Sequence, residues 1–151
     1  MTIQSKEKQV QYAGYRHSTP VQIRFKDTDA MGHINNANHY TYMELARMHY
    51  FNDVVAHDHD WTQIGFILAK MVIEYVKPLM PGDTIYVFTR CSRVGTKSFD
   101  LEYAIVRMNG GSQDLMATGT SVIVCYNYKQ KVSIAVPSEW KEKMQAFEKS
   151  R

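Results

Sequence analysis

One long segment without helix breakers, followed by a series of strand-like segments, constrains the fold of this chain most strongly. Residues 37–56 contain no glycine or proline, and apolar side chains such as Met43 and Tyr50 recur at helical spacing. In the middle of this segment only Glu44 and Arg47 are charged. Because a helix that is apolar on most of its faces must be covered by other elements, the pattern predicts one long helix enclosed by the rest of the chain.

Strand patterns precede and follow this helix. The first segment alternates apolar and polar residues, and the later ones alternate in the same way or are rich in β-branched residues. The five segments cover residues 21–25, 67–76, 84–93, 98–105 and 116–126. Turns are predicted at Pro81-Gly82-Asp83 and Asn109-Gly110-Gly111, because these residues accept tight-turn conformations. A single helix among strands joined by hairpins indicates an α+β fold with an antiparallel sheet that curls around the helix.

The length of 151 residues fits one domain, and no linker-like segment divides the chain. We expect residues 1–18 to form a flexible N-terminal tail and residues 19–151 to form the domain, with a short helix at residues 139–149. The tail lacks the apolar core of a signal peptide, and no apolar stretch reaches the roughly 18 residues needed to cross a membrane. A cytoplasmic protein without a membrane partner is therefore expected.

The charge distribution and the spacing of Cys and His residues argue against nucleic-acid binding and against metal binding. The net charge is +3, but the basic residues are scattered among acidic ones, so a nucleic-acid partner is not expected. Cys91 and Cys125 lie far apart in apolar segments, which predicts two buried thiols. The pair His57 and His59 has no third ligand nearby, so no metal site is expected.

A motif at the start of the predicted helix carries the functional signal. The chain contains the sequence DTDAMGHINN at residues 27–36, then Tyr40, and then ELAR at residues 44–47. Together these resemble the signature of the 4-hydroxybenzoyl-CoA thioesterase-like hotdog family, and they are most similar to its long-chain acyl-CoA thioesterase branch. The resemblance covers residues 20–128. It implies a hotdog fold, in which a curved antiparallel sheet of about five strands wraps around one long central helix.

The resemblance implies an acyl-CoA thioesterase that hydrolyses a fatty-acyl or aryl-acyl thioester to the free acid and CoA, without a cofactor. Asp29 takes the position of the catalytic carboxylate, either activating water or attacking the thioester to give an anhydride. The backbone N–H of Asn36 takes the position of the oxyanion donor, where unpaired N–H groups and the helix dipole favour negative charge. The alternative for Asp29 is a turn residue, and the alternative for Asn36 is plain helix capping. Asp27 is expected to be structural.

Three further residues of the motif, His33, Asn35 and Glu44, have roles that the sequence alone does not decide. His33 either orients the thioester or the water, or holds the turn by a hydrogen bond. Asn35 is expected to cap the helix with its side chain. Another branch of hotdog thioesterases uses a helical glutamate as the catalytic carboxylate, but Glu44 is three residues before Arg47, and this spacing predicts an intrahelical ion pair.

A basic segment follows the third predicted strand. Lys97 resembles the start of the family's CoA-phosphate region, and Arg90 and Arg93 lie close to it in sequence. Lys and Arg side chains are the usual partners of nucleotide phosphates, so these three residues are candidates for binding the substrate. The alternative is that they are ordinary charged residues of the surface.

The resemblance also bears on partners and on alternative functions. The substrate is expected to be an acyl-CoA or an acyl-ACP, and the protein a homodimer or homotetramer, because the family's active sites lie between subunits. An unpaired edge strand would otherwise remain open to association. The alternatives are an acyl-ACP thioesterase, a hotdog dehydratase and a non-catalytic module that binds acyl thioesters. The sequence contains no G-x-S-x-G, G-x-G-x-x-G or P-loop motif.

Overall fold

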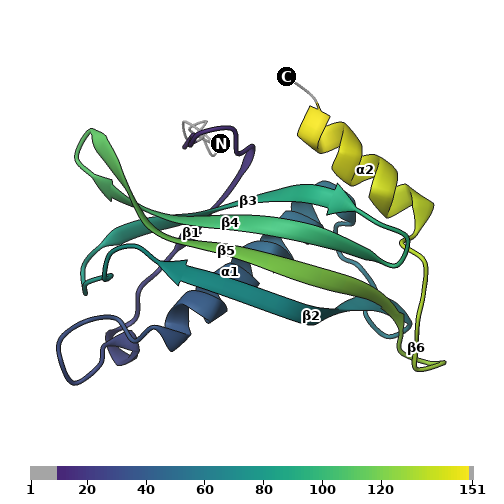
Figure 1. Ribbon diagram of the computed structural model, residues 1–151, viewed down its shortest axis with the longest axis horizontal. Coiled ribbons are helices and arrows are strands. Elements are labelled where there is room, and N and C mark those ends of the chain that lie inside the picture. The colour runs from purple at the N-terminus through teal and green to yellow at the C-terminus, as the bar shows by residue number, and fades with distance from the viewer. Residues whose placement is uncertain (1–9, 150–151) are drawn as a thin grey trace, which may run out of the picture.

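The computed structural model describes residues 10–149, which form one curled sheet, a long helix on its concave side and a second helix at the C-terminal end (Figure 1). The strands are β1 (His17–Val21), β2 (Ile64–Tyr75), β3 (Thr84–Val94), β4 (Ser98–Asn109), β5 (Ser112–Asn127) and β6 (Val132–Ser133). The helices are η1 (Phe25–Asp27), α1 (Ala37–Tyr50), η2 (Phe51–Val55) and α2 (Ser138–Lys149). The sheet has the order β1-β3-β4-β5-β2, with β6 beside β5. All pairs are antiparallel.

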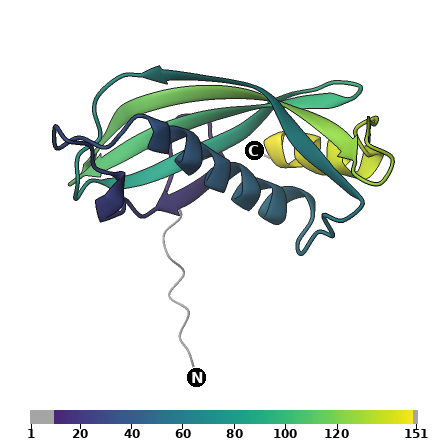
Figure 2. The ribbon, with the colours of Figure 1, turned by 90° about the horizontal axis from the view of Figure 1, so that it is seen from below.

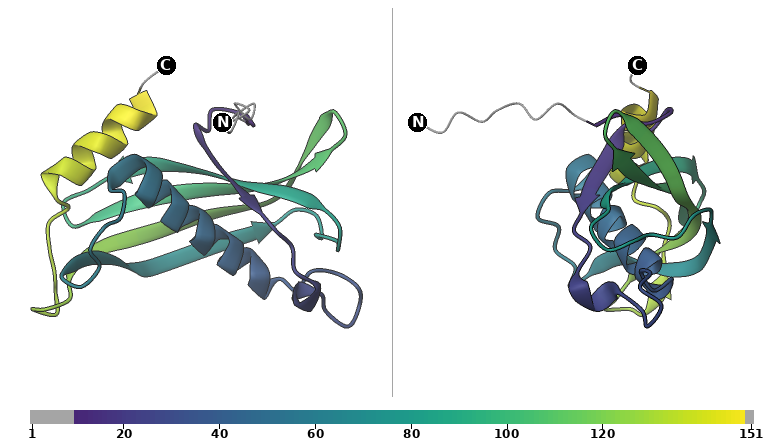
Figure 3. Two further views of the ribbon diagram at one scale, coloured as in Figure 1. Left: turned by 180° about the vertical axis from the view of Figure 1, so that it is seen from behind. Right: turned by 90° about the vertical axis from the view of Figure 1, so that its left-hand side faces the viewer.

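The sheet wraps around α1, which continues without a break into the single π-turn of η2 (Figure 3). The inner face of α1 buries Met43, Ala46 and Tyr50 in the main core, together with apolar residues of β3, β4 and β5. Burial on this scale is the main source of stability for a helix of this kind. The predicted long helix and the predicted α+β architecture are therefore confirmed.

The later strands follow the sequence pattern closely. The predicted hairpin after β4 is present, with Asn109 opposite Ser112 and Gly110 at a φ of +60°, a conformation that glycine adopts without strain. The predicted terminal helix is α2, which packs on η2 and β3. Within the sheet as described, β2 lies at one edge and pairs only with β5.

The first strand differs from its prediction. The alternating pattern placed a strand at residues 21–25, but β1 ends at Val21, and the Phe25 side chain is 96% exposed. The reason is local: the backbone N–H and the guanidinium of Arg24 both donate to the Asp27 carboxylate, at 3.0 Å each, and these bonds stabilise the turn η1. The chain therefore leaves the sheet before Ile23.

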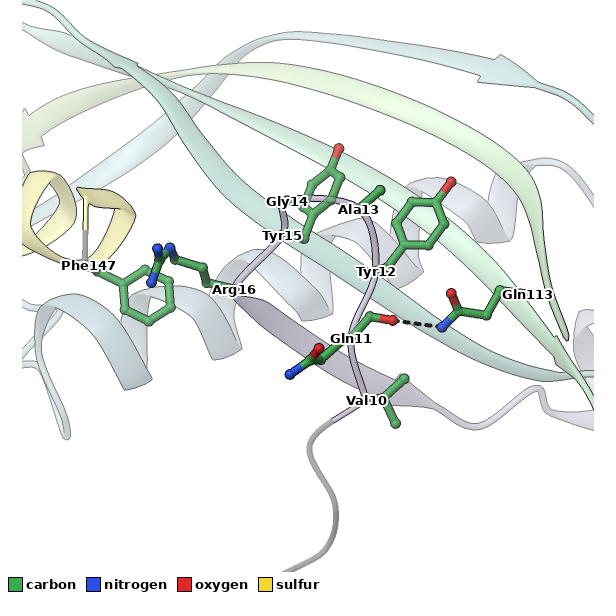
Figure 4. Close-up of a pocket in the computed structure, with 9 residues that line it drawn as sticks. All are labelled: Val10, Gln11, Tyr12, Ala13, Gly14, Tyr15, Arg16, Gln113 and Phe147. Carbon is green, nitrogen blue, oxygen red and sulfur yellow. Dashed lines mark hydrogen bonds between the residues drawn. The ribbon is translucent and has the colours of Figure 1, made fainter. Parts of the chain in front are cut away.

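β1 begins at His17, inside the segment predicted as a flexible tail. Before it, Tyr12 and Tyr15 pack on Phe88 on the convex face of the sheet, with ring centroids 5.3 and 6.1 Å from the Phe88 ring. Figure 4 shows this segment beside Gln113, whose side-chain amide donates to the Gln11 carbonyl at 2.7 Å. The first nine residues of the predicted tail lie outside the described residues. Within residues 10–149, no helix has the length and apolar character needed to cross a membrane.

Candidate active site

The loop between η1 and α1 holds Asp29 in a defined orientation. One carboxylate oxygen, Oδ1, accepts the backbone N–H groups of Met31 at 2.8 Å and His33 at 3.1 Å. The Asp29 N–H in turn donates to the His33 carbonyl at 2.7 Å, and Thr28 forms a bridge with Ile34. The other carboxylate oxygen accepts no hydrogen bond from the described residues. Asp29 thus acts as a turn residue, as one alternative predicted, and still presents one free oxygen.

Asp27 has a different environment. It is buried, and its carboxylate accepts hydrogen bonds from the Tyr42 hydroxyl at 2.7 Å and from Arg24. Burial by itself would raise the pKa of Asp27, but the hydrogen bonds from Tyr42 and Arg24 and the Arg24 charge hold that pKa below its usual value. Because both oxygens are occupied, this carboxylate ties η1 to α1 and is not free to meet a substrate.

The first turn of α1 presents a free backbone donor. The Asn35 side chain accepts the N–H of Ala37 at 3.0 Å, so it caps the helix as predicted, and the Asn35 N–H donates to the Asp27 carbonyl at 2.8 Å. Asn36 precedes the helix directly, and no described residue accepts its N–H. The Tyr75 hydroxyl donates to the Asn36 carbonyl at 3.0 Å. An unpaired N–H at a helix start favours negative charge.

These groups line one open cleft of about 470 Å³ at one end of the molecule. Figure 2 shows the loop before α1 at that end, beside the last residues of β2. The lining residues are Asp29, Met31, His33, Ile34, Asn35, Asn36, Tyr75, Val76, Lys77 and Pro78. The structure therefore brings together the three predicted catalytic residues. It adds a wall at residues 75–78, which no local sequence pattern indicated because this contact depends on the folding of distant segments.

The predicted substrate-binding residues lie elsewhere in the subunit. Arg90 is paired with Glu102 at 2.6 Å, and its guanidinium stacks 4.4 Å from the Tyr15 ring centre. Arg93 makes two hydrogen bonds to Asp100, at 2.9 and 3.1 Å. Both arginines are thus occupied on the outer side of the sheet.

Lys97 is exposed in the connection between β3 and β4, at the end of the molecule opposite to the cleft (Figure 1). One subunit therefore does not bring Lys97, Arg90 or Arg93 to Asp29.

The predicted ion pair between Glu44 and Arg47 is wrong. Glu44 is exposed, whereas Arg47 is 3% exposed and faces the sheet, and the two side chains form no ion pair. The reason is the position of Arg47 on the helix: it lies four and eight residues after Met43 and His39, on the stripe that points inward. The Nε and Nη2 atoms of Arg47 have no hydrogen-bond partner among the described residues.

His39 is a second inward-facing polar residue that the sequence did not single out. Its side chain is 1% exposed, and its ring lies 4.9 Å from the Tyr75 ring, edge to face. Neither ring nitrogen has a partner in residues 10–149. Burial lowers the pKa of His39, and the nearby carbonyl groups of Asn36 and Asn35 oppose this effect only in part. The imidazole is therefore neutral near pH 7.

The two histidines of the H-x-H pair are separated by the fold. His57 is exposed beside Asp58, whereas the His59 ring bonds the Ile64 carbonyl at 2.6 Å. Across the described part of the chain, no group of three His, Cys, Asp or Glu side chains is arranged to hold a metal ion.

Comparison with known proteins places this chain in a family. The model of the thioesterase-like superfamily matches residues 23–146. The long-chain acyl-CoA thioesterase FadM of Escherichia coli is 24% identical over 137 residues, which cover 87% of this chain and 98% of FadM. The uncharacterized protein YsmA of Bacillus subtilis is 27% identical over 122 residues, which cover 81% of this chain and 80% of YsmA.

A solved structure agrees with these relatives. The structure of a Thermus thermophilus thioesterase complexed with coenzyme A and Zn matches with a TM-score of 0.78 and 29% identity, covering 93% of this chain and 99% of that one. The family model covers most of the chain, and the sheet curls around one central helix as the motif predicted. The chain therefore belongs to the thioesterase-like superfamily and has its hotdog fold.

Proposed function

We propose that this protein is an acyl-CoA thioesterase and that the cleft at the start of α1 is its active site. One observation carries the proposal: the cleft holds a carboxylate oxygen of Asp29 and a backbone N–H of Asn36, neither of which is used within the described residues. A base or nucleophile and an oxyanion donor are the two elements that thioester hydrolysis requires. The names of FadM and of the Thermus thermophilus thioesterase support CoA esters as the substrate class.

The chemistry follows from these two groups. In the general-base route, Asp29 takes a proton from water while the water oxygen attacks the thioester carbonyl carbon. In the nucleophilic route, the Asp29 oxygen attacks the carbonyl itself and gives an anhydride, which water then hydrolyses. In both routes the Asn36 N–H donates to the carbonyl oxygen as it becomes negative. In the general-base route, the carbon–sulfur bond breaks after water has added, and the thiolate takes the proton that Asp29 accepted. In the nucleophilic route, the carbon–sulfur bond breaks as the anhydride forms, and the thiolate takes a proton from water.

Release of free thiol tests this proposal directly. The purified protein is mixed with a panel of acyl-CoA esters, and the CoA that is set free is followed with a thiol reagent. Catalytic release supports the thioesterase. Binding of acyl-CoA without release would instead indicate a binding module, and loss of water from a hydroxyacyl-CoA without thiol release would indicate a dehydratase. If thiol release were faster from acyl-ACP than from acyl-CoA, acyl-ACP would replace the CoA ester as the proposed substrate.

A homodimer formed through the edge strand β2 is part of the proposal. β2 spans Ile64–Tyr75, and its exposed face includes the apolar side chains of Ile67 and Val72, each 42% exposed. Long apolar edge strands are templates for pairing with another chain. Antiparallel pairing of β2 with a second β2 would continue the sheet across two subunits and place these side chains beside those of the partner strand.

The dimer is tested by sedimentation. We expect the wild-type protein to sediment as a dimer or as a multiple of one, and Val72→Lys to shift the population toward the monomer and lower activity, because a charge at the edge opposes pairing. The control is Val132→Lys, since Val132 is 47% exposed on the short strand β6, away from this edge. A stable, fully active wild-type monomer would remove the dimer from the proposal.

In this dimer, Lys97 can reach the cleft of the other subunit, although it cannot reach the cleft of its own. Antiparallel pairing of β2 with β2 brings the start of one β2 next to the end of the other. The start of β2 lies near the connection before β4, because Ile67 and Ser98 both pair with Val124. Lys97 of the partner subunit would then lie at the same end as the cleft. We propose that this lysine binds the phosphates of CoA.

Lys97→Ala should raise KM for CoA esters several-fold and leave kcat nearly unchanged. The same variant should behave like the wild type on a short thioester that lacks the nucleotide, because that substrate has no phosphate to bind. Steady-state kinetics on the two substrates make the comparison, with Lys129→Ala as a control at another exposed lysine. Equal losses on both substrates would count against a phosphate contact.

A further inference from the structure

The peptide group that carries the Asn36 N–H is anchored at its opposite edge. A trans peptide group is planar, and its C=O and N–H point in opposite directions, so the Asn35 carbonyl and the Asn36 N–H turn as one unit. Within the described residues this carbonyl accepts the backbone N–H of Asn38 at 2.9 Å and the side-chain Nδ2 of Asn38 at 3.2 Å. These two donors fix the plane of the peptide group, and with it the direction of the Asn36 N–H.

The Asn38 side chain also joins this peptide group to a fixed part of the fold. Its Nδ2 atom donates to the Asp27 carbonyl at 3.0 Å, and an asparagine NH₂ group has two hydrogens, so both of its bonds form at once. The Asp27 carbonyl also accepts the Asn35 N–H at 2.8 Å. Asp27 is buried, and its carboxylate is bonded to Tyr42 and Arg24. Asn38 therefore holds the turn before α1 against a residue that is itself fixed in the core.

Helix formation alone does not account for the contacts of Asn38. The Asn35 side chain already caps α1 by accepting the Ala37 N–H at 3.0 Å. Asn38 is the second residue of the helix, where asparagine is less favourable than alanine. Its side-chain amide donates to two carbonyl groups that precede the helix, and the residue does not line the cleft. The contacts are thus directed at the turn that carries the Asn36 N–H.

We propose that Asn38 is a positioning residue that aims and polarises the oxyanion donor of Asn36. This inference rests on the proposed thioesterase function and adds to it a residue that does not touch the substrate. Hydrogen-bonded amides polarise one another, so two donors on the Asn35 carbonyl make the N–H at the far edge of the same peptide group a stronger donor. The N–H is also aimed before the oxyanion forms, which avoids reorganisation in the transition state.

The first test removes the Asn38 side-chain amide. Asn38→Ala deletes both side-chain bonds and keeps the backbone N–H, and alanine favours the helix, so the fold is expected to survive. The Asn36 N–H is then present but less firmly aimed. The kcat for thiol release should fall at least about tenfold, but less than the roughly 10²–10³ lost with the donor itself. KM should change by less than about twofold, because Asn38 does not line the cleft.

Asn52→Ala is the matched control. Asn52 is also a half-buried asparagine of a helical segment, η2, and its side chain also makes two hydrogen bonds. It donates to the Asp53 carboxylate at 3.3 Å and accepts the Asp58 N–H at 3.4 Å, away from the cleft. This variant should keep the wild-type kcat.

A double-mutant cycle shows whether Asn38 acts through the Asn36 N–H. In the Asn36→Pro protein this donor is absent, so adding Asn38→Ala should cause no further loss of kcat. Independent losses that multiply in the double variant would overturn the positioning role, because Asn38 would then affect activity by another route.

The positioning role also has a readout that needs no substrate. The order parameter of the Asn36 amide, measured by ¹⁵N relaxation, should lie near the rigid value of about 0.85 in the wild type and fall in Asn38→Ala. Asn52→Ala should leave it unchanged. A flexible Asn36 amide in the wild type, or no fall in Asn38→Ala, would overturn the proposal.

Circular dichroism and thermal melting establish that each variant is folded. If Asn38→Ala does not fold, Asn38→Leu replaces it, because leucine has a similar branched shape, favours the helix and donates no hydrogen bond. A folded variant with the wild-type kcat would overturn the positioning role, even in an active thioesterase. If the wild type releases no thiol from any acyl thioester, the proposed function fails instead. The Asn36 order parameter then decides by itself: a fall in the variant supports the anchoring by Asn38, and no fall overturns it.

Discussion

Asp29→Asn should keep the fold and lose at least about 10²-fold in kcat. The amide oxygen of asparagine can still accept the N–H groups of Met31 and His33, which hold the turn at 2.8 and 3.1 Å. The free carboxylate oxygen is replaced by an NH₂ group, which neither takes a proton from water nor attacks a carbonyl carbon. The substitution thus separates the two roles that the structure gives to Asp29, and only the chemical role is lost.

The measurement is kcat for thiol release, made on protein that melts at the wild-type temperature. Asp60→Asn is the matched control, because Asp60 also holds a turn, accepting the N–H of Thr62 at 2.9 Å and its hydroxyl at 2.7 Å, but does not line the cleft. It should retain full activity. If Asp29→Asn is as active as Asp60→Asn, the Asp29 carboxylate is only a turn residue and the proposed mechanism is wrong.

The sequence predicted the parts of the fold that depend on local patterns. The helix at residues 37–56 and the hairpin at Asn109-Gly110-Gly111 are confirmed, because spacing and turn chemistry act over a few residues. The motif also named three residues that line one cleft. The wall at Tyr75 could not be predicted in this way, since its hydroxyl meets a carbonyl 39 residues away and depends on the register of the sheet.

Two predictions made from local patterns were wrong, and each error has a physical reason. The pattern at residues 21–25 was counted as a strand, although the hydrogen bonds of Arg24 and Asp27 turn the chain away from the sheet there. The spacing of Glu44 and Arg47 suggested an ion pair, although the helix directs Arg47 into the interior. In the first case a specific side-chain contact overrode a correct local rule, and in the second case tertiary packing did so. Polar residues placed against their local preference often mark functional regions.

Two substitutions of Asn36 test whether a single backbone N–H group binds the oxyanion. Asn36→Ala keeps the N–H, and the side chain of Asn36 makes no capping bond, because Asn35 caps the helix. Activity should therefore stay within about tenfold of the wild type, a change smaller than the loss expected from removing an oxyanion donor. Asn36→Pro removes the N–H itself. This comparison keeps the position constant and changes only whether a donor is present.

Proline fits the backbone at this position. The φ angle of Asn36 is −56°, within the range that proline fixes, and no described residue accepts the N–H that would be lost. The fold is therefore expected to survive, and circular dichroism verifies this before the kinetics. Without the donor, the negative charge that develops on the thioester oxygen loses its partner, and kcat should fall by roughly 10²–10³. Since the proline changes no other hydrogen bond of the described cleft, a folded Asn36→Pro protein with near-normal kcat would mean that another group binds the oxyanion.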